Sequence, residues 1–115
     1  MKILLIEPGK NPVITNIDGS LASMQQTVGG LIQLIYPFPD DPDIGLVCLV
    51  CNEEGKILDL PPSRTLIDDK FNVIDVIAGS FFLCGAPALS ENLESLPEDK
   101  LSEYQAVFSF PVVQV

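Results

Sequence analysis

The chain contains no histidine, and only six of its 115 residues are lysine or arginine. Without histidine the commonest general base of enzymes is absent, and Ser-His-Asp or Cys-His arrangements are excluded within one chain. The few bases stand against 16 acids, which leaves a net charge of −10. Proteins that bind nucleic acids or anionic membranes do so through lysine and arginine. We therefore expect no direct nucleic-acid partner and no membrane partner.

Long apolar runs are also missing. None approaches the roughly 18 residues that a membrane-spanning helix needs. The apolar segment after Lys2 is short and ends at Glu7, unlike the longer apolar region of a secretory signal. We therefore expect a mature cytoplasmic protein. With 115 residues, of which 47% are apolar, the chain is long enough to bury a core as a single domain over residues 1–115.

Three cysteines are present, Cys48, Cys51 and Cys84, and the first two form a C-x-x-C pair. This spacing can indicate a metal or redox site. Here the pair lies within an apolar run, and residues three apart in a strand point to opposite faces of the sheet. A structural zinc site would also have to recruit a carboxylate, because histidine is absent. We predict buried thiols and no metal or other cofactor; a peripheral reactive thiol is the alternative.

A continuous apolar run from Ile44 to Cys51 is the most distinctive stretch of the chain. It has no alternating polar residues, which predicts a strand that is covered on both faces. The chain would then turn through Asn52–Gly55 and return through Lys56–Leu58. Gly55 could supply the positive φ of a tight turn. The sequence thus predicts a central β-hairpin, closed by the two prolines at 61 and 62.

The remaining elements follow from the period of the apolar residues. An apolar, β-prone run predicts a strand over Lys2–Glu7, and alternation predicts another over Pro12–Ile17. Further strands are expected over Leu31–Tyr36 and over Phe81–Gly85, and the composition of the latter predicts burial on both faces. Helical spacing appears over Ser20–Val28, Leu89–Leu96 and Glu98–Phe108. Asp18 is the expected N-cap of the first helix, and Gly29 or Gly30 is its expected left-handed end. The segment Phe110–Val115 could be a last strand or a docking tail. Together these elements predict an α+β fold, a mostly antiparallel sheet with helices packed on one face.

The acids are spread over several segments, chiefly a proline-rich loop at 37–43, the turn at 53–54 and the region 91–103. They could form a solvated surface that keeps the protein soluble. They could instead imitate DNA and occupy a basic groove. Arg64 could bind a carboxylate or phosphate group, although an ion pair with Asp59, Asp68 or Asp69 is favoured. The candidate interaction surface comprises Asp40, Asp41, Asp43, Glu53, Glu54 and Arg64.

Four sequence blocks occur in an order that is familiar from one family. They are EPGK near the start, VGGLIQLIYPF, LVCNEEGKILDLPPSR and IAGSFFLCG. In these blocks, over about residues 1–85, the chain resembles the family catalogued as domain of unknown function 3846. The resemblance implies a bacterial or phage protein, often encoded near mobile elements. The family pattern commonly has asparagine before the arginine of LPPSR, where this chain has Ser63. The resemblance carries over no functional residue, and it leaves the C-terminal region 86–115 unplaced.

Three classes of function are compatible with these features. The first is a non-enzymatic accessory protein that binds another protein; a homo-oligomer, in which the partner is a second copy, is one form of this class. The second is an acidic DNA mimic that inhibits a host nuclease or restriction system. The third is a small enzyme that uses paired carboxylates such as Glu53 and Glu54. Adjacent acids in turns are usually solvated, whereas a catalytic acid needs burial to raise its pKa. We therefore favour the protein-binding class.

Overall fold

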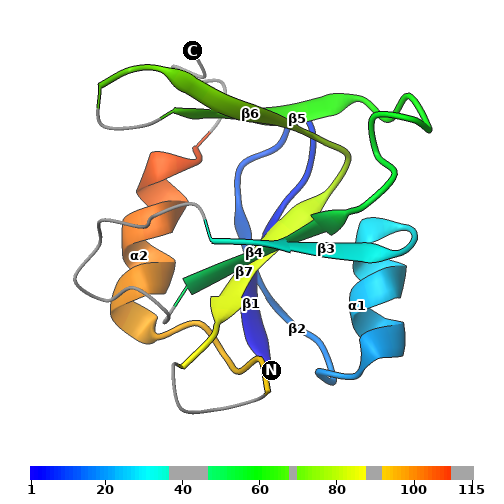
Figure 1. The fold of residues 1–115 in the computed structure, drawn as a ribbon. Helices are drawn as coiled ribbons and strands as arrows, with labels where there is room; N and C mark the ends of the chain where they lie inside the picture. Colours follow the sequence, from blue (N-terminus) through cyan, green and yellow to red (C-terminus); the bar gives the residue numbers. More distant parts are fainter. Residues whose placement is uncertain (37–46, 68–69, 88–91, 110–115) are drawn as a thin grey trace.

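The structure, a computed structural model, describes residues 1–36, 47–67, 70–87 and 92–109 (Figure 1). Within these ranges the chain forms seven strands and two helices. In chain order they are β1 (Lys2–Ile6), β2 (Val13–Asn16), α1 (Leu21–Val28), β3 (Ile32–Ile35), β4 (Val47–Asn52), β5 (Pro62–Ile67), β6 (Val73–Ala78), β7 (Phe81–Gly85) and α2 (Glu98–Val107). The α+β class and the mostly antiparallel sheet are confirmed.

Five strands form the main sheet in the order β2-β1-β7-β4-β3, and every neighbouring pair is antiparallel. The hairpin of β1 and β2 is built on the turn after Ile6. Every residue of β4 and β7 is buried, because both strands lie inside the sheet and both of its faces are covered. Leu49 packs in one core and Val50 in the other. The expectation that these two apolar strands are covered on both faces is confirmed.

The predicted central hairpin is wrong. Strand β4 pairs with β3 and β7, and the segment Lys56–Leu58 forms turns instead of a strand. The chain then continues into β5, which pairs with β6 in a separate two-stranded sheet. The reason is competition for the edge of β4, since the fully buried β7 removes far more apolar surface from water than Lys56–Leu58 could. The backbone of Asp59, with φ of 57°, takes the positive-φ position of this segment.

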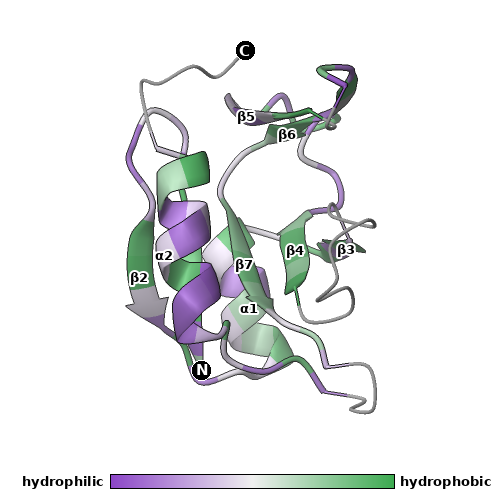
Figure 2. Ribbon diagram, turned by 90° about the vertical axis from the view of Figure 1, so that its left-hand side faces the viewer, coloured by the Kyte–Doolittle hydropathy of each residue, from purple (hydrophilic) through white to green (hydrophobic). Residues whose placement is uncertain are grey.

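The two helices lie on opposite faces of the main sheet, which corrects the prediction of helices on one face (Figures 1 and 2). Helix α1 buries Met24 and Val28 in one core. Helix α2 buries Leu101 and Tyr104 in the other, together with its C-cap residue Phe108. The cause is the apolar character of β4 and β7 on both of their faces, because a sheet with two apolar faces needs a cover on each.

Both ends of α1 follow local rules, and only the N-cap differs from the prediction, by two residues. Ser20 is the N-cap and its side chain accepts a hydrogen bond from the Ser23 backbone N–H at 3.0 Å. Asp18, the predicted cap, instead accepts the backbone N–H of Ser20 at 2.7 Å. Hydrogen bonds from Ser20 lower the pKa of Asp18 to about 2. Gly29 ends the helix with φ of 83°, as predicted.

The C-terminal helix is confirmed, since α2 begins after Pro97. The segment before it is not helical where it is described, because Glu94 forms a β-bridge with Gly85. That bridge extends β7 and uses backbone groups that a helix would need. The predictions made for residues 37–46, 68–69, 88–91 and 110–115 lie outside the described residues.

The two-stranded sheet of β5 and β6 lies over one end of the main sheet, at the top of Figure 1. Leu66 from β5 and Ile77 from β6 join the core that α2 covers. Strand β6 thereby comes close to β4, although no hydrogen-bonded ladder joins the two sheets among the described residues. This junction positions the candidate site.

Candidate functional site

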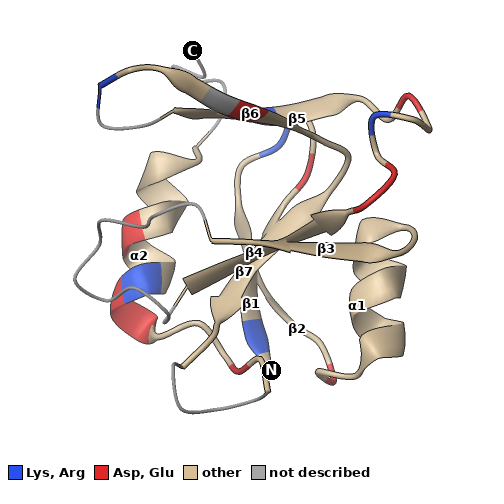
Figure 3. Ribbon diagram, viewed as in Figure 1, with Lys and Arg blue, Asp and Glu red and all other residues tan. Residues whose placement is uncertain are grey.

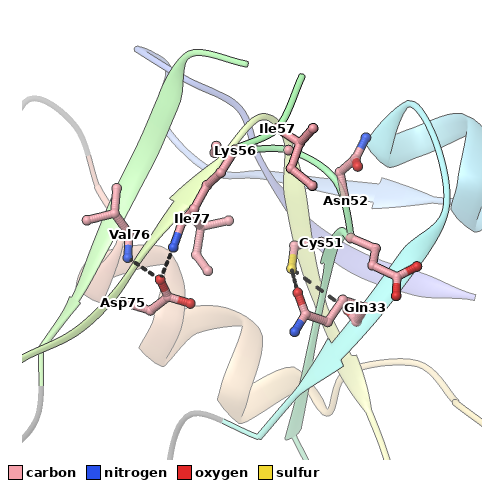
Figure 4. A pocket seen from close by; sticks show the side chains of 11 residues that line it. Gln33, Cys51, Asn52, Lys56, Ile57, Asp75, Val76 and Ile77 are labelled. Atoms are coloured by element: carbon pink, nitrogen blue, oxygen red, sulfur yellow. Dashed lines mark hydrogen bonds and ion pairs between the residues drawn. The ribbon is translucent and has the colours of Figure 1, made fainter. Parts of the chain in front are cut away.

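A cavity of about 200 Å³ lies where the main sheet meets the two-stranded sheet (Figure 4). Its wall comes from β3, the end of β4, the turns over residues 53–59 and four consecutive residues of β6. The side chains that line it include Gln33, Cys51, Glu53, Lys56, Ile57 and Asp75. Because they come from segments far apart in the chain, only the folded protein brings them together.

An ion pair closes one side of this cavity. The Lys56 ammonium lies 2.5 Å from an Asp75 carboxylate oxygen. The same oxygen accepts the backbone N–H of Val76 at 2.7 Å. The two charged side chains are 66% and 36% exposed, and such solvated pairs contribute only about 0–1 kcal/mol to stability. The structural consequence of the pair is therefore the position of the carboxylate over the Val76 amide.

Cys51 lies on the opposite side, next to Gln33 of β3 (Figure 4). Its Sγ is 3.8 Å from the Gln33 carbonyl oxygen and 3.9 Å from the Gln33 side-chain oxygen, so the thiol can donate weakly to either. Burial, and then the charge of Asp75, raise the pKa of Cys51 to about 11. The sulfur is therefore a neutral thiol near pH 7 and not a thiolate nucleophile.

The turns after β4 are held in place by Asn52 and Gly55. The buried Asn52 side chain donates to the Val28 carbonyl oxygen at 3.2 Å and accepts the Glu54 backbone N–H at 2.8 Å. A Cβ atom on Gly55 would lie 2.7 Å from the Ala78 carbonyl oxygen, so only glycine allows the turn to approach β6 this closely. The shape of the cavity thus depends on these two residues.

Apolar side chains are exposed along this end of the molecule. Ile57, on the cavity wall, is 81% exposed, and the adjacent Leu58 is 55% exposed. On the two-stranded sheet unit, Phe71 and Val73 are also exposed. Single exposed apolar residues are ordinary. Two consecutive ones beside a polar cavity form a small apolar ledge, which we define as Ile57 and Leu58.

Of the six predicted interaction residues, the structure describes Glu53, Glu54 and Arg64. Glu53 and Glu54 are exposed in the turn after β4, and Glu53 also lines the cavity. The acids at 40, 41 and 43 lie outside the described residues. Arg64 is only 2% exposed, so its inclusion in a surface needs correction.

Arg64 instead joins three parts of the chain in the interior. Its Nε and Nη2 donate to the Phe108 carbonyl oxygen at 3.0 and 2.9 Å. Nη2 also donates to the Lys10 carbonyl oxygen at 2.6 Å, and Nη1 to that of Ser63 at 2.8 Å. Burial lowers the pKa of Arg64, but a guanidinium remains protonated in proteins. The side chain thereby ties β5 to the turn after β1 and to the end of α2.

The described acids fall into separate groups (Figure 3). Those of the turns after β4 and those of α2 lie on opposite sides of the molecule. Two acids of α2 also have lysine partners, because Lys2 pairs with Glu98 at 2.9 Å and Lys100 with Glu103 at 3.1 Å. A DNA-like surface would need acids on one face.

The cysteines are free and buried. Cys48 lies directly opposite Cys84 on the neighbouring strand, and both face the core under α1, whereas Cys51 faces the other core. This separation of the C-x-x-C pair was expected of a strand. A hydrogen bond with Cys48, together with burial, raises the pKa of Cys84. Among the described residues, no three Cys, Asp or Glu side chains lie close enough to hold a metal ion.

Sequence reasoning missed Gln33, Lys56 and Asp75 as site residues. Two of them had a signal, because Gln33 interrupts the apolar strand LIQLIY and Asp75 interrupts VIDVIA. A lone polar residue in an otherwise apolar strand indicates either an outward face or a special contact. The site offers groups of both charges, an amide and an apolar ledge, a combination suited to binding a polypeptide.

The whole chain was compared with known proteins, solved structures and protein families. No curated protein and no solved structure matches it. None of the described helices is long and apolar enough to cross a membrane. One family model matches residues 1–109, which extends beyond the 85 residues that carry the resemblance and includes α2. The chain therefore belongs to the family described as Domain of unknown function (DUF3846).

Proposed function

We propose that this protein is a non-enzymatic accessory protein that acts by binding another protein. The observation that carries the proposal is the apolar ledge, Ile57 and Leu58, beside the cavity. The exposed side chains cost free energy in water, and a partner that covers them would recover roughly 25 cal/mol for each Å² of apolar surface. A phage or mobile-element setting comes with the family resemblance.

The neighbouring chemistry supports binding more than catalysis. Cys51 has a pKa of about 11 and is a neutral thiol. The Lys56 ammonium is bonded to Asp75. Paired carboxylates were the sequence-based reason to consider an enzyme, and Glu53 and Glu54 are both exposed, where water solvates the charged form of an acid.

A DNA mimic is less well supported. Such a mimic needs a continuous row of acids, whereas the described acids lie on opposite sides of the molecule (Figure 3). Lysines neutralise part of the acidic surface of α2. We therefore place protein binding first.

The test is capture of partners from the native host, followed by mass spectrometry. Wild-type protein is compared with an Ile57→Ser/Leu58→Ser variant and with a control variant, Leu21→Ser/Val107→Ser. The control removes two apolar side chains that are 56% and 55% exposed on the two helices. We expect a protein retained by wild type and control and lost from the ledge variant. Retention by all three baits, or by none, would contradict the proposal.

A further inference from the structure

Strand β6 has one edge without a strand partner among the described residues. It pairs with β5 in a sheet of two strands, while residues Asp75 to Ala78 line the cavity in sequence. A strand edge carries N–H and C=O groups that can pair with another chain. The cavity therefore runs beside a strand edge of the kind to which extended peptides add.

The Asp75 carboxylate covers this edge. It accepts the Val76 N–H at 2.7 Å, in the way that the carbonyl oxygen of an added strand would. Lys56 holds the carboxylate from the other side (Figure 4). Charged side chains commonly protect free edges against unwanted pairing. Here the carboxylate is 36% exposed and its lysine partner is 66% exposed, so a backbone carbonyl oxygen can reach the Val76 N–H and replace it.

The residues around this edge provide two features that protection of the edge alone would not require. A cavity of about 200 Å³ next to the edge can take a side chain, and Ile57 forms its apolar rim. The edge strand β2 also exposes apolar residues, Val13 and Ile14, but it contributes nothing to the cavity wall. The edge strand β3 contributes Gln33 alone to the wall, whereas β6 contributes four consecutive residues, so its edge follows the pocket most closely among the described strands.

Charge identifies the partner. Among the side chains that line the cavity, Glu53 and Asp75 are acids and Lys56, which pairs with Asp75, is a base. Glu54 and Asp59 are exposed in the same turns. The whole chain has a net charge of −10. Opposite charges favour and steer association. An extended segment with basic and apolar residues in alternation fits this edge, because alternate side chains of a strand point to opposite sides.

We propose that the free edge of β6 accepts an extended, basic and apolar segment of a partner protein as an added strand. A carbonyl oxygen of the segment replaces the Asp75 carboxylate on the Val76 N–H. An apolar side chain enters the cavity beside Ile57, and a basic side chain pairs with Glu53. This inference rests on the proposed function and names its surface and its class of partner.

The test uses a short peptide of alternating lysine and valine with blocked ends. A matched peptide carries N-methyl groups on alternate residues, which removes backbone donors and keeps the charge and side chains. Fluorescence anisotropy measures affinity at about 0.15 M salt, where surface charges are screened over ~8 Å. Amide NMR shifts locate the binding site on the protein. We expect saturable binding of the first peptide with a shift of the Val76 amide, and affinity at least tenfold lower for the methylated peptide.

Variants of Asp75 test whether its carboxylate competes with the peptide for the Val76 N–H. Asp75→Ala and Asp75→Asn remove the same charge, but only Asp75→Ala frees the Val76 N–H, so we expect Asp75→Ala to bind the peptide roughly tenfold more tightly than Asp75→Asn does. Asp75→Asn keeps an acceptor for that N–H. Asp99→Ala, which removes one acid from α2, is the matched control and should bind as wild type does. The wild-type comparison of the two peptides stands even if an Asp75 variant fails to fold.

Several outcomes would overturn the proposal. Equal binding of both peptides would show attraction by charge alone, and amide shifts confined to β2 or β3 would place the added strand elsewhere. If the wild-type protein does not bind the first peptide at all, the proposal is refuted. Dimerisation of Asp75→Ala through the Val76 edge without peptide would make the occupant a second copy of this chain. In each case a host protein that is captured through Ile57 and Leu58 would leave the proposed function intact.

Discussion

Replacing Arg64 with methionine should destabilise the protein strongly. Methionine fills most of the space of the arginine stem and carries no hydrogen-bond donor. The change therefore removes the hydrogen bonds to the carbonyl oxygens of Phe108, Lys10 and Ser63. It also removes a positive charge from the C-terminal end of α2, where the helix dipole favours one.

The expected magnitude follows from what the carbonyl groups lose. A buried acceptor left without a donor costs about 1–3 kcal/mol. Phe108 is 5% exposed, so its carbonyl oxygen should lose this full amount of free energy. Lys10 is exposed, and its carbonyl oxygen can accept a hydrogen bond from water instead. Together with the dipole contribution of about 0.3–1 kcal/mol, we expect a loss of about 2–4 kcal/mol. That is a large part of the 5–15 kcal/mol typical of a whole domain.

Urea unfolding followed by circular dichroism measures this loss, since the chain has no tryptophan for fluorescence. With a slope of about 2 kcal/mol per M, the middle of the usual range, the midpoint should fall by about 1–2 M. Lys2→Met is the control, because it removes a base from a solvent-exposed ion pair and should cost no more than about 1 kcal/mol. If Arg64→Met unfolds at the same midpoint as Lys2→Met, the carbonyl-binding role of Arg64 is refuted.

Three further predictions concern the core and the cavity. Leu49→Ala should cost about 2–5 kcal/mol because the side chain is fully buried, while Glu53→Ala should be nearly neutral; urea midpoints that coincide would contradict this. Gly55→Ala should lose about 1–3 kcal/mol, since its Cβ would lie 2.7 Å from a backbone oxygen, and an unchanged thermal midpoint would show that the turn can shift freely. Cys51, with a pKa raised to about 11, should react with iodoacetamide at pH 8 far more slowly in folded than in urea-unfolded protein. Because the pKa of Cys51 is higher in the folded protein, the stability that its neutral thiol contributes is present below pH 9 and is lost as the pH rises toward 11. Rapid labelling of Cys51 in folded protein, mapped by mass spectrometry, would show that the thiol is accessible and ionised.

Much of the secondary structure could be read from the sequence because its causes are local. The runs that became β1, β4 and β7 are apolar enough to demand burial, whatever their neighbours are. Gly29 ends α1 because glycine adopts positive φ without strain. Proline at position 97 marks the start of α2 for a similar local reason. These features depend on residues close together in the chain.

Strand partners and the placement of the helices were decided by the tertiary structure. The segment after β4 looked like a returning strand, but β7, some thirty positions farther along the chain, buries more apolar surface against the same edge. A sequence pattern shows that a strand needs a partner. It does not show which of several apolar segments will pair with a given edge of that strand. The same holds for the helices, whose apolar stripes require a sheet but do not say which face.

The candidate site lies wholly in the second category. Glu53 was recognisable as an exposed acid in a turn, but Asp75 and Lys56 meet only because β6 folds back beside the end of β4. Arg64 was expected to pair with a nearby acid or to bind a carboxylate or phosphate group, because its guanidinium suits such partners. Its burial depends on carbonyl groups 44 and 54 residues away in sequence. The sequence by itself determined which segments must be buried and where they end, because burial and capping are local demands; the tertiary structure decided what each segment contacts, because contacts are chosen among distant competitors.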